Sequence, residues 1–135
     1  MVLDTNVVLD LLVFCDPSTE ALRSALASGR WVWIATQAMR AELQRVSTYP
    51  TIARAMALRD LQAAQVLEKF DRTRLAQAAA PPCPARCSDP DDQPFIDLAV
   101  AQRALLVSKD AAVLRMRRRL ASLGVAVQSI FTSAM

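Results

Sequence analysis

The sequence predicts a single α/β domain, residues 1–135, in which helices cover both faces of a parallel sheet. Its length of 135 residues fits one domain, since single domains commonly run about 100–150 residues. Hydrophobic residues make up 53% of the chain, which excludes wholesale disorder. Short apolar segments alternate with segments of helical spacing, an order typical of parallel sheets with crossover helices.

The first part of the chain is expected to alternate as strand, helix, helix, strand and helix, over residues 1–3, 7–14, 17–28, 31–34 and 37–48. Thr5 or Asn6 is placed to begin the first helix, although strand and helix are hard to separate in that apolar run. Gly29 ends the second helix. Thr36 is a suitable N-cap for the third, which Pro50 terminates.

The second part begins with residues 51–79, which lack glycine and proline and are expected to form one long helix or a helical pair. The proline-rich PPCPARCSDPDDQP that follows is expected to be a loop. The remaining elements are expected to be a helix, a strand, a helix and a strand over residues 95–103, 104–108, 111–120 and 124–127. The sequence contains neither a repeat nor a sign of a second domain.

Histidine is absent from the chain, which excludes serine and cysteine triads that use histidine, histidine general bases and imidazole metal ligands. Any catalysis must therefore depend on carboxylates. The net charge is +3, and all but Lys69 and Lys109 of the 16 basic residues are arginine. Arginine binds phosphate through a bidentate fork, so the composition weakly favours an anionic partner.

The chain has no apolar run near the roughly 20 residues needed to span a bilayer, and no signal segment at its start. We therefore expect a cytoplasmic protein with no membrane association. The odd number of cysteines favours free thiols in a reducing compartment. Cys83 and Cys87 resemble half of a zinc site, but one further cysteine and no histidine are insufficient to complete it.

Four acidic residues lie at element ends or among apolar neighbours: Asp4, Glu42, Asp92 and Asp110. Asp4 and Asp110 follow predicted strands, and ligands of open parallel sheets bind at the carboxyl ends of the strands. Clustered carboxylates resist joint ionisation, and a divalent cation removes that difficulty. Mg²⁺ and Mn²⁺ prefer carboxylate oxygens and act on phosphates without histidine.

Each acid also has a purely structural interpretation. Asp4 and Asp110 are both placed to cap the helices that follow them, and the DPDD cluster suits a helix start. Glu42 alone is weak evidence, because glutamate on a helix is usually solvated. Their order along the chain, strand–Asp, helix–Glu, helix–Asp, strand–Asp, is more specific than any one of them.

With these residues in place, the chain resembles the PIN domain family over nearly its full length, and within it the bacterial branch described as toxin components of toxin–antitoxin systems. VLDTNVVLDLL is similar to the family's opening motif and MRAEL to its helix glutamate. DPDDQPFIDLAVA is similar to the acidic motif after the long loop, and ALLVSKDAAVL to the closing strand–acid motif. Only three residues precede Asp4, fewer than in the family's first strand. Either this strand is short, or the true start of the chain lies upstream.

The resemblance implies a three-layer α/β/α sandwich with a central parallel sheet and a Mg²⁺- or Mn²⁺-dependent endoribonuclease site. Asp4, Glu42, Asp92 and Asp110 would be the acidic ligands, with Asn6 or Thr5 as a polar supporting group. Asp92 is favoured over Asp91 by its spacing from Ala99, and Asp97 is expected to face elsewhere. The implied partners are an RNA substrate, a protein antitoxin and a second copy of the chain in a homodimer.

A second hypothesis is an inactive PIN-like scaffold that binds RNA or protein, although the presence of all four acids argues against it. A phosphoacceptor domain would need an aspartate after a middle strand, and residues 31–37 contain none. Lys109 either approaches a phosphate or is solvated, and the same two alternatives apply to the arginines of residues 115–119. Trp31 and Trp33 are expected to pack on the sheet rather than to stack on bases.

Overall fold

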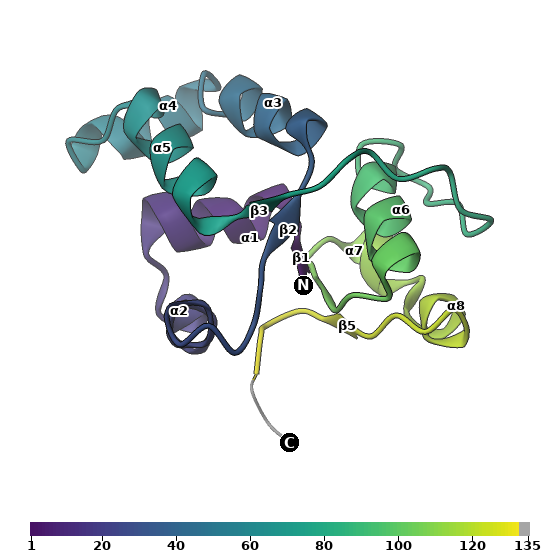
Figure 1. Cartoon of the computed structure of the whole chain (residues 1–135). Helices are drawn as coiled ribbons and strands as arrows, with labels where there is room; N and C mark the ends of the chain where they lie inside the picture. Colours follow the sequence, from purple (N-terminus) through teal and green to yellow (C-terminus); the bar gives the residue numbers. More distant parts are fainter. Residues whose placement is uncertain (133–135) are drawn as a thin grey trace.

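The computed structural model describes residues 1–132 and contains, over that range, eight α-helices and five short parallel β-strands (Figure 1). The strands are β1 Val2–Leu3, β2 Ile34–Ala35, β3 Leu75–Ala76, β4 Leu106–Val107 and β5 Val127–Gln128. The helices are α1 Thr5–Leu9, α2 Glu20–Ala27, α3 Gln37–Val46, α4 Pro50–Leu58, α5 Ala63–Thr73, α6 Gln93–Gln102, α7 Ala111–Leu114 and α8 Arg117–Ser122. A π-helical segment, η1 Asp10–Phe14, continues α1, and a 3₁₀ turn, η2 Pro17–Thr19, precedes α2.

The strands form two hydrogen-bonded groups, β1-β4-β5 and β2-β3, and every pair within them is parallel. The groups are joined at Met1, whose N–H group donates to the Val32 carbonyl at 2.6 Å and whose carbonyl accepts from the Ile34 N–H at 2.9 Å. These two bonds bracket Trp33, as in a parallel ladder. The strand order is therefore β3-β2-β1-β4-β5. The predicted α/β class with a parallel sheet is confirmed, although the sheet is small.

Helices lie on both sides of the strands, α1 to α5 on one side and α6 to α8 on the other (Figure 1). The indole of Trp33 is 1% exposed and meets the ring of Phe70 edge to face, with centroids 5.0 Å apart. Trp31 packs in the same manner against Phe131 at 5.5 Å. The expected packing role is confirmed for Trp33, which is buried beside β2. Trp31 contacts Phe131 but remains 36% exposed outside the strands, so its role stays a prediction.

Several boundaries differ from the sequence-based expectation. The strand expected at residues 31–34 is regular only at Ile34–Ala35, and the last strand lies at Val127–Gln128 rather than 124–127. The segment 51–79 is a helical pair followed by β3, which was not predicted, because Leu75–Ala76 is exposed and lacks an apolar strand pattern. The helix expected over 111–120 is divided into α7 and α8 around residues 115–116.

The apolar run after β1, in which the sequence did not separate strand from helix, is helical, and its π-helical end was not predicted. The chain leaves η1 through Cys15, which has a φ of 48° and so adopts the left-handed conformation. This turn directs the chain from η1 into α2. Within residues 1–132, no helix combines the length and the apolar character that crossing a membrane requires.

Candidate metal centre

Three carboxylates converge at the carboxyl ends of two neighbouring strands, β1 and β4. Asp4 follows β1 and Asp110 lies three residues after β4, and the two strands are joined there by the bond from the Asp4 N–H to the Val107 carbonyl, 3.0 Å. The third carboxylate, Asp92, is the residue before α6, a helix that packs on β1 and β4. One oxygen of each carboxylate lies within 4.8 Å of the others. The topology thus brings together residues that are 88 and 106 positions from Asp4.

Asp4 is held by a serine that the sequence reasoning missed. The hydroxyl of Ser108 donates to Asp4 Oδ2 at 2.6 Å and accepts from the Asp110 N–H at 3.1 Å. Ser108 is fully buried, and Asp4 is 4% exposed. The Asp4 side chain makes no cap hydrogen bond to α1, so capping does not explain its position. The sequence did contain a signal for Ser108, because it is a small polar residue at the end of an apolar strand and lies two positions before an acid.

Asp110 combines the two interpretations that its position allowed. Its Oδ1 accepts a hydrogen bond from the Ala112 N–H at 2.8 Å, so the side chain caps α7. It nevertheless belongs to the carboxylate cluster. The neighbouring Lys109 forms an ion pair with Asp10 and is about half exposed, so its charge is compensated within the chain.

Asp92 is the least compensated member of the cluster. It precedes α6, but its side chain makes no cap hydrogen bond. Its Oδ2 is buried and has no hydrogen-bond partner among the residues that the structure describes. Asp91 is exposed and Asp89 is half-buried, and both line the same surface cavity as Asp92 without joining the cluster. The acids of the DPDD motif are therefore not interchangeable.

The loop before α6 is tied to that helix through buried side chains. Gln93 accepts from the Cys87 N–H at 2.6 Å and donates to the Ala85 carbonyl at 2.9 Å and to Asp97 at 2.8 Å. Asp97 in turn accepts from the Cys83 N–H at 3.1 Å. Asp97 thus binds the loop, as expected for a residue that faces away from Asp92. These bonds fix the segment that delivers Asp92 to the cluster.

Glu42 and Asn6 lie beside the cluster and not within it. Glu42, on α3, is half-buried and accepts a hydrogen bond from the Thr5 hydroxyl at 2.8 Å. Its other oxygen lies 4.0 Å from the guanidinium of Arg45. Asn6 is exposed at the start of α1. Both residues line a cavity of about 260 Å³ that also contains Asp4, Asp92 and Asp110.

The electrostatics of the cluster favour protonation when no cation is near. Burial, followed by the negative charges of Asp4 and Asp110, raises the pKa of Asp92 to about 8. Burial also raises the pKa of Asp4, although the hydrogen bond from Ser108 opposes that effect. Burial raises the pKa of Glu42 in the same way, opposed by the bond from Thr5. The site therefore disfavours three ionised carboxylates without a counter-ion, and a bound cation would stabilise them.

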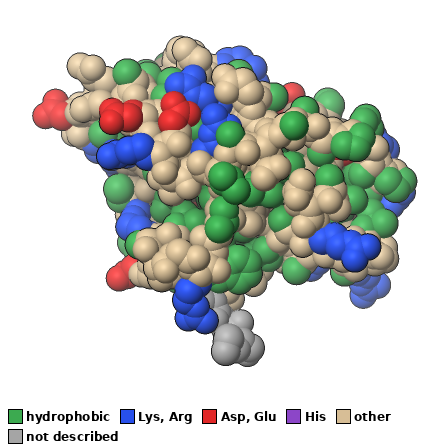
Figure 2. Space-filling view, in the orientation of Figure 1, with side chains coloured by type: hydrophobic (Ala, Val, Ile, Leu, Met, Phe, Trp, Pro, Cys, Tyr) green, Lys and Arg blue, Asp and Glu red, His purple; other side chains and the backbone are tan. Residues whose placement is uncertain are grey.

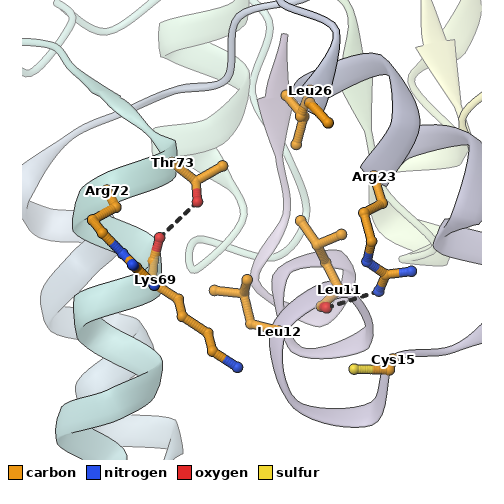
Figure 3. Close-up of a pocket in the computed structure, with 9 residues that line it drawn as sticks. Leu11, Leu12, Cys15, Arg23, Leu26, Lys69, Arg72 and Thr73 are labelled. Atoms are coloured by element: carbon orange, nitrogen blue, oxygen red, sulfur yellow. Dashed lines mark hydrogen bonds between the residues drawn. The ribbon is translucent and has the colours of Figure 1, made fainter.

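A larger cavity, of about 480 Å³, lies elsewhere in the molecule, between η1, α2 and α5 (Figure 3). Its floor includes Leu11 and Leu12, and Arg23 and Lys69 belong to its walls. None of its lining residues is acidic. The smaller acidic cavity is therefore the candidate metal centre, in spite of its size.

Comparison with protein families matches residues 1–112 to the PIN domain. The chain belongs to the PIN domain family. No curated protein gives a significant match to the sequence. PIN domains are generally metal-dependent nucleases that bind divalent ions. The matched range includes all the acids of this PIN domain's cluster.

The residues of this PIN domain fit a divalent cation. Carboxylate oxygens are the donors that hard divalent ions prefer. The buried Oδ2 of Asp92 lacks any partner in the described part of the chain, and such atoms are normally satisfied. A cation held by Asp4, Asp92 and Asp110 would supply that partner and offset the repulsion among the three carboxylates.

Replacement of Ser108 by alanine is expected to weaken divalent-metal binding about 10- to 100-fold, the usual cost of removing a group that orients a ligand. The variant leaves Asp4 in place but removes both hydrogen bonds of the hydroxyl. Calorimetric titration with Mn²⁺ measures the effect, with the exposed Ser24→Ala as a matched control. An unchanged affinity in Ser108→Ala would contradict a positioning role for this hydroxyl.

Proposed function

We propose that this PIN domain is a Mg²⁺- or Mn²⁺-dependent endoribonuclease, built as a three-layer α/β/α domain, and the toxin of a toxin–antitoxin pair. The observation that carries the nuclease assignment is the buried cluster of Asp4, Asp92 and Asp110 in a member of a nuclease family. Histidine is absent, so a carboxylate–metal site is the chemistry that the chain can offer to a phosphodiester.

Each residue of the cavity then has a distinct task. Asp4, Asp92 and Asp110 would hold the cation, and Ser108 fixes the orientation of Asp4. Glu42, held by Thr5, is the fourth acid of the cavity and would hold a second ion or orient a water molecule. Asn6 contributes an exposed amide for contact with the substrate. A bound Mg²⁺ or Mn²⁺ would lower the pKa of a coordinated water and neutralise charge on the phosphate.

Exposed basic residues support a nucleic-acid substrate. Arg45 lies beside Glu42, and the exposed arginines of residues 115–119 follow Asp110 in the sequence, between α7 and α8 and on α8. Arg119 donates to the Pro84 carbonyl at 2.8 Å, so this arginine braces the loop that leads to Asp92. On the face shown in Figure 2, basic side chains form several separate groups over different elements. Phosphate contacts are therefore expected from dispersed arginines, and RNA binding should weaken with salt.

The toxin role and the partners are supported by the sequence motifs of the bacterial branch. VLDTNVVLDLL and DPDDQPFIDLAVA both resemble that branch. We propose a protein antitoxin as the regulatory partner and a homodimer as the assembly. An antitoxin would copurify with the chain and suppress its activity, which distinguishes a toxin from a nuclease that acts alone.

The direct test is incubation of the purified chain with a mixture of single-stranded and structured RNAs. We expect cleavage with Mg²⁺ or Mn²⁺ and none with chelator, because the carboxylates alone provide no activated water. Gel electrophoresis followed by end mapping identifies the products and the cut bonds. Cleavage that persists in chelator would contradict the metal dependence. Metal-independent RNA binding without any cleavage would instead favour the scaffold hypothesis.

A further inference from the structure

The lining of the candidate metal cavity contains two chemically different kinds of residue. The first kind is acidic and includes Asp4, Asp92 and Asp110. The second kind is apolar or aromatic: Leu9, Val46, Tyr49 and Ile52. Metal ligation and its supporting hydrogen bonds explain the acidic lining residues only. The apolar lining residues offer contacts to an uncharged part of the substrate.

The spacing along α3 and α4 explains why acidic and apolar residues line the same cavity. Val46 follows Glu42 by four residues, so both lie on one face of α3. Tyr49 comes in the turn after α3, and Pro50 begins α4, with Ile52 in its first turn. The lining residues of α3 and α4 thus change from acidic to apolar after Glu42 and stay apolar or aromatic through Ile52.

Tyr49 differs from the other apolar lining residues in its surroundings. Leu9 belongs to the core, and Val46 and Ile52 pack against it. Tyr49 takes no part in the core and is 49% exposed, yet it lines the cavity. Core packing therefore does not explain an aromatic residue at this position. Its ring is available to a ligand in the cavity.

We infer that Tyr49 is a base-stacking residue, which holds the base of a nucleotide next to the scissile phosphate. The inference rests on the proposed nuclease function and adds a specificity-determining residue to it. Aromatic side chains bind single-stranded nucleic acid by stacking on bases, with little dependence on the base, because every base has a π-face. A stacked base fixes the adjacent phosphate against the acids, and such orientation contributes to rate. Unpaired nucleotides are then the preferred context of cleavage.

The test removes the ring of Tyr49 and the base that it would contact, separately and together. A short single-stranded RNA with one mapped cut site is prepared intact and with an abasic nucleotide on either side of the cut. The enzymes are the full-length wild type, Tyr49→Ala and Tyr49→Phe, which keeps the ring. Leu58→Ala is the matched control, because Leu58 is 80% exposed on α4 and does not line the cavity.

For one of the two flanking positions, we expect the abasic substrate to lower the kcat/KM of wild type about tenfold or more. On intact RNA, the kcat/KM of Tyr49→Ala should be lower than that of wild type by a similar factor. Replacing intact RNA with that abasic RNA should lower the kcat/KM of Tyr49→Ala little further. Tyr49→Phe and Leu58→Ala should retain the wild-type ratio between the two substrates. Equal losses from the abasic site in wild type and Tyr49→Ala, at both flanking positions, would overturn the inference, because the ring and the base would then act independently.

A second readout does not require turnover. RNA with 2-aminopurine at the flanking position is bound in Ca²⁺, and its fluorescence should be quenched by wild type and Tyr49→Phe but not by Tyr49→Ala. Equal quenching by wild type and Tyr49→Ala would overturn stacking even if cleavage occurs. Absence of RNA cleavage by wild type would count against the proposed function, while Tyr49-dependent quenching would still support the base contact.

Discussion

The Asp4→Asn, Asp92→Asn double variant is expected to lose about a thousandfold or more of the metal-dependent RNA cleavage. The two substitutions keep the shape of the side chains but remove two of the three negative charges that would hold the cation. Charge stabilisation by a catalytic metal amounts to several kcal/mol in the transition state, and about 4 kcal/mol corresponds to a thousandfold in rate. Single-turnover cleavage of one labelled RNA, compared with wild type at the same Mg²⁺ concentration, measures the loss.

The matched control for this experiment is Asp60→Asn, which makes the same chemical change at an exposed position. Asp60 has a φ of 51°, a conformation that asparagine tolerates well. Circular dichroism should show that all three proteins are folded, since asparagine relieves repulsion in the cluster. A double variant that cleaves at the wild-type rate would remove the basis of the nuclease proposal. A loss of activity in Asp60→Asn as well would point to a nonspecific effect.

The positions of the acids were largely accessible from the sequence, because the end of an apolar strand is a recognisable feature. Asp4 and Asp110 follow short runs of buried aliphatic residues, and parallel strands place such positions at one edge of the sheet. The helices were accessible where polar caps or glycine mark their ends, as at Thr36, whose hydroxyl accepts from the Met39 N–H at 3.3 Å.

Features that depend on the three-dimensional environment were not accessible in this way. Ser108 is an ordinary serine until the parallel pairing of β1 and β4 places its hydroxyl on Asp4. The sequence around Gln93 contains no pattern that predicts its hydrogen bonds to the loop. The β3 strand is exposed, so its pairing with β2 leaves no periodic signal. The apolar residues that line the cavity together with Glu42 are likewise recognisable only once α3 and α4 are placed in the fold.

A second large effect is expected in the pH dependence of stability. The pKa of Asp92 is raised to about 8 in the folded chain, whereas an unfolded aspartate titrates near 3.8. The folded state therefore binds this proton more tightly than the unfolded state does. In chelator, stability should fall as pH rises from about 4 through about 8, and level off above that value. The raised pKa values of Asp4 and Glu42 contribute in the same direction.

A divalent cation should reverse this loss at high pH, because it replaces the proton as the positive partner of the cluster. At a concentration of about 100 times its Kd, a ligand adds about 2.7 kcal/mol of stability, which corresponds to a Tm increase of about 10 °C for a domain of this size. Thermal unfolding of wild type and Asp92→Asn between pH 5 and pH 8.5, with chelator or Mn²⁺, measures both effects. Asp92→Asn should show a flatter pH profile and a smaller Mn²⁺ shift.

The comparison of the two proteins isolates the cluster, because every other titrating group is common to both. If the stability of wild type in chelator rises between pH 5 and pH 8, the folded state does not disfavour ionised Asp92. Another group of the chain would then compensate the charge of its buried oxygen. If Mn²⁺ stabilises both proteins equally, the cation binds elsewhere. The expected result is that stability falls with pH in chelator and that Mn²⁺ restores it only when Asp92 is present. This result would mean that the carboxylates at the carboxyl ends of β1 and β4 repel one another in the folded chain and that a bound divalent cation offsets the repulsion.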